Sequence, residues 1–262
     1  MSIVFAAIAP HSPVLIPTIG KENLNHLKAT ENAYKKLEEN MYASMPDVIM
    51  IISPHGIIQP HNFSMNLSPE FTASFEEFGD FATKLSFRGN IGFAHKVRER
   101  METRAPLQLI TIPNLDHGVS IPLYLLTQHL PKIMILPMYY SGLDLESHYK
   151  FGQLLKRDLL LHRSRVAVVA SGDLSHRLTK NAPAGYSPKG KKFDKKVIDA
   201  LLSPSPNEIL NIDKNLTTHA SECGLKSITM LMGILDGIKH EPQLLSYEYP
   251  FGVGYLTMNF QL

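Results

Sequence analysis

Four short apolar runs constrain the fold of this chain more than any other feature. They read IVFAAIA at residues 3–9, DVIMII at 47–52, KIMILPMYY at 132–140 and SRVAVVASGD at 164–173. Within their apolar stretches none of them alternates apolar and polar residues, as a strand with one solvated face does. Unbroken apolar strands are typical of a sheet that helices cover on both faces. The runs therefore predict buried strands of an α/β protein.

Segments of helical periodicity separate these runs. Helices are expected over residues 21–45, 91–103, 119–130, 144–162, 194–202, 206–212 and from 221 to about 235. The helix at 119–130 is expected to begin through Ser120 and Pro122. The alternating order predicts one domain over residues 1–262, with a central, mostly parallel mixed sheet flanked by helices.

Two stretches depart from this simple order. Residues 57–90 contain short strand-like pieces, FSMNLS and TKLSFRG, which suit antiparallel additions to the sheet. Residues 177–195 are rich in proline, glycine and lysine and predict a loop that lies over a site as a lid. Its lysines and their neighbours (Lys189, Lys191, Lys192, Lys195 and Lys196) are expected on a solvated face, with attraction of an acidic substrate or partner as the alternative.

Composition excludes several classes of protein. The 262 residues are 44% hydrophobic and 19% charged, which suits a globular chain and argues against disorder. The net charge of +2 gives no strong attraction to nucleic acid or to an acidic membrane. No apolar stretch approaches the length that spans a bilayer. The one cysteine, Cys223, excludes a disulfide framework within the chain and favours a reducing, cytoplasmic location.

Histidines follow several of the apolar runs at the point where each ends. His11 follows the first run and His55 the second, His117 comes after LITIPN, and Asp173 and His176 follow the last run. In an open α/β sheet the carboxyl ends of parallel strands meet at one edge. We therefore expect these side chains to converge, although any single histidine after a strand is more often a hydrogen-bonded structural residue.

The converging residues predict a metal site. Two neutral imidazoles, His11 and His55, need a third ligand, and Glu222 in HASECGL is the candidate, with a role at a helix start as its alternative. Cys223 is expected to be a small buried residue and not a ligand, and support of a metal ligand is the alternative role for His219. Two histidines and one carboxylate form the facial triad of non-haem Fe(II) oxygenases, with Zn, Cu or Mn as alternative metals.

Three further residues suit acid–base chemistry at such a centre. His176 is the expected general acid or base near neutral pH. Asp173 is expected to orient a neighbouring imidazole, with a turn carboxylate as the alternative. His117 is expected to supply a second donor toward substrate or oxygen.

At these residues the sequence resembles the LigB-like superfamily, which contains class III extradiol ring-cleavage dioxygenases and Memo-like proteins. The matching pieces are APHSP, SPHG, DHG, SGDLSH, APAGYSPKGKKFD, ASECG and FGVGYL, which run from residue 9 to residue 256. The SGDLSHRLTKNAPAGYSPKG region is similar to the branch called AmmeMemoRadiSam system protein B.

The resemblance implies a LigB-like (phosphorylase/hydrolase-like) fold and assigns roles to residues. It places His11, His55 and Glu222 at the Fe(II) positions, His176 at the acid/base position and His117 at that of a second active-site histidine. Memo-like relatives lack the carboxylate in some cases and carry cysteine in its place. The implied partners are a small aromatic diol and O₂, an AMMECR1-like or radical-SAM protein in trans, and a second copy of the chain.

Three functions follow from these observations. The first is an extradiol-type dioxygenase that opens the ring of a catechol-like substrate. The second is a Memo-like metal-binding protein without ring-cleavage activity. The third is a metal-dependent hydrolase, which usually requires more carboxylate ligands than Asp116 and Asp173 supply.

Overall fold

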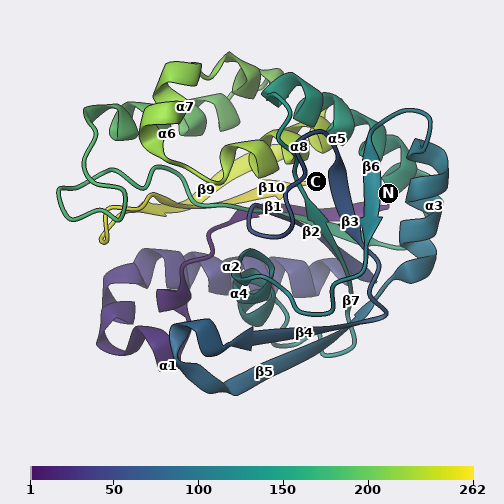
Figure 1. The fold of residues 1–262 in the computed structure, drawn as a ribbon, viewed down its shortest axis with the longest axis horizontal. Coiled ribbons are helices and arrows are strands. Elements are labelled where there is room, and N and C mark those ends of the chain that lie inside the picture. The colour runs from purple at the N-terminus through teal and green to yellow at the C-terminus, as the bar shows by residue number, and fades with distance from the viewer. Residues whose placement is uncertain (1) are drawn as a thin grey trace.

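Ten strands form one mixed sheet with a parallel centre (Figure 1). The computed structural model describes residues 2–262. The strands are β1 (Ile3–Ala9), β2 (Val48–Ser53), β3 (Phe63–Asn66), β4 (Glu70–Phe75), β5 (Asp80–Gly89), β6 (Leu107–Ile110), β7 (Met134–Tyr139), β8 (Val166–Ser171), β9 (Glu241–Glu248) and β10 (Tyr255–Gln261). Their order is β4-β5-β7-β2-β8-β1-β10-β9, and β3 pairs with β7 and β6. Strands β7, β2, β8 and β1 are parallel, while β10 and β9 add antiparallel pairs. The expected mostly parallel mixed sheet is confirmed.

Helices cover both faces of this sheet. The α-helices are α1 (Pro17–Gly20), α2 (Lys28–Ser44), α3 (Ile91–Met101), α4 (His117–Leu126), α5 (Leu145–Leu160), α6 (Pro188–Leu201), α7 (Lys214–Ala220) and α8 (Leu225–Leu235). The 3₁₀ helices are η1 (Pro13–Leu15), η2 (Lys21–Leu27), η3 (Glu76–Phe78) and η4 (Pro206–Asn211). Helices α2 and α4 lie on one face, and α5, α6 and α8 on the other (Figure 1). No helix in the described part of the chain has the length and apolar character that a bilayer crossing requires.

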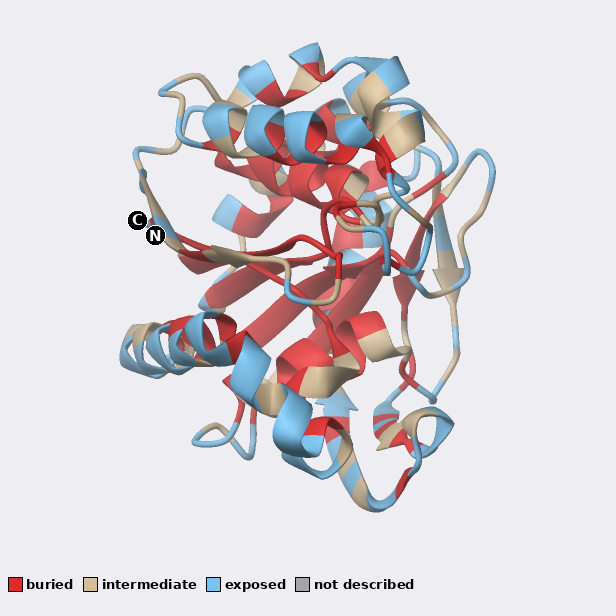
Figure 2. Cartoon of the chain, turned by 90° about the vertical axis from the view of Figure 1, so that its left-hand side faces the viewer, coloured by how far each residue is buried: buried red, intermediate tan, exposed pale blue. Residues whose placement is uncertain are grey.

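The central strands contribute to two separate cores because successive side chains point to opposite faces. In β2, Met50 and Ile52 pack toward α5 and α8, whereas Ile49 and Ile51 pack toward α2 and α4. Figure 2 shows the buried strands enclosed between the two helical layers. Both faces of each central strand are therefore shielded from water, which explains why apolar and polar residues do not alternate in these strands.

Two predicted boundaries are wrong. The loop expected over 177–195 ends early, because α6 begins at Pro188 and the Ser187 hydroxyl accepts a hydrogen bond from the Lys189 N–H. The lysines in this stretch alternate with buried residues such as Phe193 and Val197, so they mark one face of a helix. Helix α4 is capped by Asp116, whose carboxylate accepts from the Val119 N–H, so Ser120 and Pro122 lie inside it.

Other elements were missed or misplaced. Strands β4 and β9 and helix α7 carry exposed polar residues and have no unbroken apolar run. Strand β6, which precedes His117, pairs with β3 and does not join the central parallel group. Helix α8 begins at Leu225, so Glu222 precedes the helix that was expected to begin at 221.

Candidate metal centre

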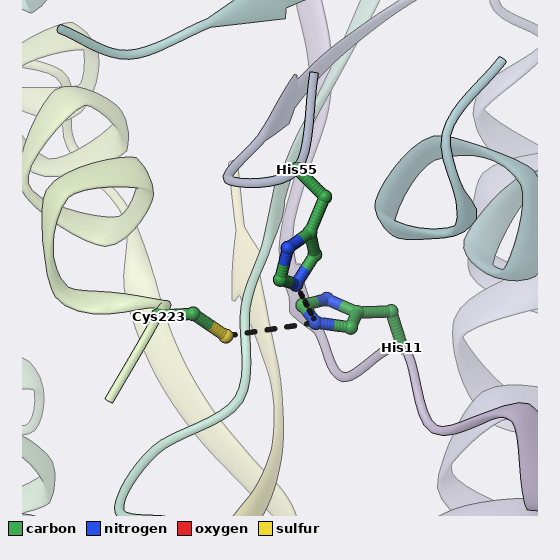
Figure 3. Close-up of side chains that lie close together, drawn as sticks. All are labelled: His11, His55 and Cys223. Atoms are coloured by element: carbon green, nitrogen blue, oxygen red, sulfur yellow. Dashed lines mark hydrogen bonds between the residues drawn. The ribbon is translucent and has the colours of Figure 1, made fainter. Parts of the chain in front are cut away.

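His11 and His55 converge at the carboxyl edge of the sheet. His11 follows β1 and His55 follows β2, and these two strands flank β8. The two Nε2 atoms are 2.9 Å apart, and the rings meet edge to face with centroids 4.7 Å apart (Figure 3). The parallel order of the strands therefore brings together residues that are 44 positions apart in sequence.

Cys223 completes a group of three ligand atoms. Its Sγ lies 3.5 Å from Nε2 of His11, and the ligand atoms of His11, His55 and Cys223 all lie within 4.8 Å of one another (Figure 3). Cys223 comes from the turn between α7 and α8, which can approach β8 because two glycines meet there. A Cβ added to Gly172 would lie 2.2 Å from the Cα of Gly224.

Glu222 is not part of this group among residues 2–262. Its Oε2 accepts a hydrogen bond of 2.6 Å from the N–H of Leu225 at the start of α8, and the side chain lines a different cavity. Burial raises the pKa of the Glu222 carboxyl to about 7, although the Leu225 hydrogen bond opposes the shift. Ser221, just before these residues, is left-handed, with φ 51° and ψ 48°. The alternative role at a helix start describes what Glu222 does in this structure.

Two hydrogen bonds hold His11 in place. Its Nδ1 lies 2.9 Å from the hydroxyl of Ser171, the last residue of β8, and its backbone N–H donates to the Asp173 carboxylate at 3.0 Å. Oδ2 of Asp173 is also 3.7 Å from Nε2 of His11. Burial raises the pKa of Asp173, and the nearby histidines partly offset this. Asp173 thus lies where an orienting carboxylate is expected.

The Ser171 contact was not anticipated from the sequence. The signal available was a serine ending the strand directly before GD. Ser53 ends β2 in the same way: it donates to Asp116 at 2.5 Å and accepts from the His55 N–H at 3.2 Å. Serines that end adjacent strands therefore support both histidine loops.

His117 lies beside the pair from a different direction. It is the first residue of α4, and its ring stacks on that of His55 with centroids 4.2 Å apart. Its Nδ1 is 3.6 Å from Oε1 of Glu77. His117 therefore lies beside His55, as the sequence predicted. It is positioned by the start of α4 and not by the end of a central strand.

His176 presents one free ring nitrogen. Its Nδ1 lies 3.0 Å from the carbonyl oxygen of Leu174, which suits an Nδ1–H donor and leaves Nε2 as an acceptor. The positive charge of His176 contributes, after larger effects, to the lowered pKa of both His11 and His55. His219, by contrast, bonds the Asn215 carbonyl of its own helix.

The pKa values of both central imidazoles are lowered, which favours their neutral form. Burial lowers the pKa of His11 well below its usual value, and His117 and His176 lower it further. Burial also lowers the pKa of His55 to about 3, followed by the effects of His11 and His117. Neutral imidazole is the form that binds a metal ion. With a thiol beside them, these nitrogens fit a transition metal or zinc better than Mg²⁺ or Ca²⁺, which prefer oxygen ligands.

An open cavity of about 800 Å³ adjoins the histidines. His55, His117 and Tyr139 line its inner end, and Lys84, Glu76 and Glu77 lie on its outer wall. Gly56, which follows His55, makes room for Tyr139, whose ring would lie 2.1 Å from a Cβ at that position.

The fold and the clustered ligand atoms define an α/β protein with a candidate metal centre at the carboxyl ends of its parallel strands. The chain belongs to the LigB family: residues 5–258 match the catalytic LigB subunit of aromatic ring-opening dioxygenase.

Three relatives illustrate the range of similarity. Protein CA_C1420 of Clostridium acetobutylicum is 29% identical over 264 residues, which cover 97% of this chain and 56% of the clostridial protein. This chain thus spans about half the length of that curated relative. The 4,5-DOPA dioxygenase extradiol of Mirabilis jalapa is 25% identical over 85% of this chain and 86% of its own. The crystal structure of uncharacterized protein JW3007 from Escherichia coli K12 has a TM-score of 0.72 at 17% identity, covering 98% of this chain and 99% of that one, and it supports the fold alone.

Proposed function

We propose that this chain is a metal-dependent, extradiol-type dioxygenase that opens the ring of a catechol-like substrate with O₂. The observation that carries this proposal is the meeting of His11, His55 and Cys223 beside a cavity that also contains His117. Membership of the LigB family supports it, and so does the similarity to a plant protein named as an extradiol dioxygenase. In the reaction, a ring carbon–carbon bond next to the diol breaks and both oxygen atoms of O₂ enter the product.

The proposed ligands are His11, His55 and Cys223, with the cysteine at the position that the sequence assigned to Glu222. Fe(II) is the proposed metal, and Zn, Cu or Mn are the alternatives. When bound, such an ion brings diol and O₂ together and passes electron density between them. A thiolate requires a reduced cysteine, and we therefore propose a reducing, cytoplasmic location.

The protein's own groups have separate tasks in this proposal. Nε2 of His176 accepts a proton from a substrate hydroxyl and later returns it, because its Nδ1 is held by the Leu174 carbonyl. His117 donates toward oxygen from its place against the His55 ring. Asp173 orients His11 through the backbone N–H. The cavity wall excludes part of the solvent and fixes the ring plane of the substrate.

The reaction is tested by anaerobic loading with Fe(II), followed by a panel of catechols and then air. Ring-opened products are conjugated and absorb visible light, and O₂ uptake is recorded in parallel. We expect one O₂ consumed per product formed. A protein that binds iron but consumes no O₂ with any catechol would contradict the proposal.

The ligand assignment is tested by measuring bound metal in His11→Ala, His55→Ala, Cys223→Ala and Glu222→Gln. We expect the first three to lose metal and Glu222→Gln to keep it. If Cys223→Ala keeps its full metal content and Glu222→Gln loses metal, the third ligand is the Glu222 carboxylate and not the Cys223 thiol.

The acid–base role is tested with His176→Ala. We expect this variant to keep its metal and to lose about 100- to 10,000-fold in turnover, the usual contribution of a general acid–base. Turnover at the wild-type rate would exclude the role.

A second candidate is a Memo-like metal-binding protein without ring-cleavage activity. The thiol of Cys223 at the third position is the observation that favours it, because a thiolate suits softer metal ions than a carboxylate does. For this candidate we propose an AMMECR1-like or radical-SAM protein as the partner in trans. Tight metal binding without O₂ consumption, together with capture of such a partner, would favour this candidate.

A further inference from the structure

A second cavity has Glu222 in its lining and is separate from the cavity beside His55. It has a volume of about 510 Å³ and is enclosed by the start of α5, the end of η4, α7 and the first turn of α8. The two cavities share no lining residue. Small-molecule sites usually measure about 300–1,000 Å³, so this cavity has room for a compact organic ligand.

The second cavity has an apolar wall and five charged side chains in its lining. Asp144, Glu146 and Lys214 are exposed, whereas Glu222 and Lys226 are half-buried. Leu145, Leu210 and Ile212 form an aliphatic wall. Glu222 and Lys226 face the same space from α8 and the turn before it. Although they are four positions apart, no ion pair within 4.0 Å joins them among residues 2–262.

Both charged groups keep unused hydrogen-bonding capacity. The Glu222 carboxylate accepts from the Leu225 N–H through Oε2, and a carboxylate has about four acceptor sites. The Lys226 ammonium donates to the Ser141 carbonyl at 2.9 Å and has about three donors in all. Thr217 and Thr218 donate to carbonyls of their own helix region. Of the other two carboxylates in the lining, Asp144 accepts from the Ser147 N–H at 2.9 Å and Glu146 pairs with Lys150 at 2.7 Å. Glu222 and Lys226 therefore remain a half-buried acid and base that do not form an ion pair with each other.

We infer that this cavity binds a zwitterionic small molecule of the α-amino acid class with an apolar side chain. The ligand's ammonium group pairs with Glu222, its carboxylate pairs with Lys226, and its side chain packs on the aliphatic wall. Lys214 at the rim adds a second positive charge near the carboxylate. A ligand with a single charge leaves one of the two protein groups without a partner, and that loss makes the site selective.

The test uses the full chain and the common protein amino acids, screened by ligand-observed NMR. We expect an amino acid with an apolar side chain to bind with a dissociation constant of about millimolar or tighter. The matching amine without the carboxylate and the matching acid without the amine are then measured. Each should bind about tenfold to a hundredfold more weakly, the cost of a lost hydrogen bond to a charged group.

Matched variants locate the site. Glu222→Gln and Lys226→Met should weaken binding by a similar factor, while Glu146→Gln at the rim should not, because that carboxylate already pairs with Lys150 at 2.7 Å. Glu222→Gln keeps the size of the side chain and an oxygen that can accept from the Leu225 N–H. If Lys226→Met fails to fold, binding to Glu222→Gln alone therefore tests the site. The inference is overturned if no amino acid binds, if a single-charge analogue binds equally well, or if Glu222→Gln binds at full strength.

Discussion

Ser171 fixes the orientation of a proposed ligand through a single hydrogen bond. In the tautomer that binds a metal through Nε2, the Nδ1–H of His11 donates to the Ser171 hydroxyl at 2.9 Å. Ser171→Ala removes this acceptor and leaves a buried N–H without a partner. We expect metal affinity to fall about 10- to 100-fold, measured by competition with a chelator.

Ser64 provides a control for this prediction. It is equally buried in β3 of the same sheet, and its hydroxyl has no hydrogen-bond partner. Ser64→Ala should leave metal affinity unchanged. Equal effects of the two substitutions would mean that Ser171 acts through general packing and not through His11.

Asp194 makes stability depend on pH through a buried carboxylate that is not one of the proposed metal ligands. Its carboxylate is buried, accepts from the Ser175 N–H at 2.9 Å and from the Tyr247 hydroxyl at 2.7 Å, and its pKa is raised by burial from 3.8 to about 6. The folded state therefore binds this proton more tightly than the unfolded state. Its contribution to stability is present below about pH 4 and is lost as pH rises through about 6, a change of about 2–3 kcal/mol.

The substitution Asp194→Asn removes this titration while keeping an oxygen for Ser175 and an amide for Tyr247. The free energy of unfolding of the variant, relative to the parent, should rise between pH 4 and pH 6, as measured by denaturant titration at several pH values. Asp199→Asn changes an exposed carboxylate on the same helix and is the control. A difference that stays constant with pH would contradict the role of Asp194.

At the residue scale the sequence predicted His11 and His55 because each follows an unbroken apolar strand directly. The parallel strands β1 and β2, which flank β8, then bring the two side chains to the same edge of the sheet. The third position was beyond such reasoning, because Glu222 and Cys223 are neighbours in sequence and the apolar pattern does not show which of them faces the histidines. The close contact of Gly172 with Gly224 likewise depends on two distant turns meeting.

At the scale of elements, α2 ends in a strained conformation. Met45 caps the helix with φ 43° and ψ 62°, a left-handed conformation that favours glycine, and its side chain is 68% exposed. Met45→Gly relieves the contact of Cβ with the backbone but adds freedom to the unfolded chain. We expect a net stabilisation of about 0.5–1 kcal/mol, measured from the denaturant midpoint. Met45→Ala keeps Cβ and should give no gain; a similar gain with alanine would point to the exposed side chain as the cause.

The elements that the sequence predicted best are those buried on both faces. Both faces of strands β1, β2, β7 and β8 are buried, so almost every residue in them is apolar and the sequence predicts these strands clearly. Strands β4 and β9 lie at the two edges of the sheet, where exposed polar residues give a weak pattern. The loop expected before α6 was misjudged because lysines on a solvated helix face resemble a lysine-rich loop when burial is unknown.

At the scale of the whole molecule, the candidate metal centre joins segments from both ends of the chain. His11 follows the first strand, and Cys223 precedes α8, with 212 positions between them. An ion bound there is bound by the folded state alone, so binding stabilises the entire fold and not one loop.

Metal binding should therefore raise the melting temperature of the chain. At free metal about 100-fold above the dissociation constant, linkage gives about 2.7 kcal/mol, which corresponds to roughly 5–10 °C for a chain of this size. The measurement is thermal unfolding with anaerobic Fe(II) or with Zn²⁺, before and after a chelator. Cys223→Ala should lose most of the rise and Glu222→Gln should keep it. The same rise in a variant that lacks both imidazoles, His11→Ala with His55→Ala, would show that the ion binds elsewhere.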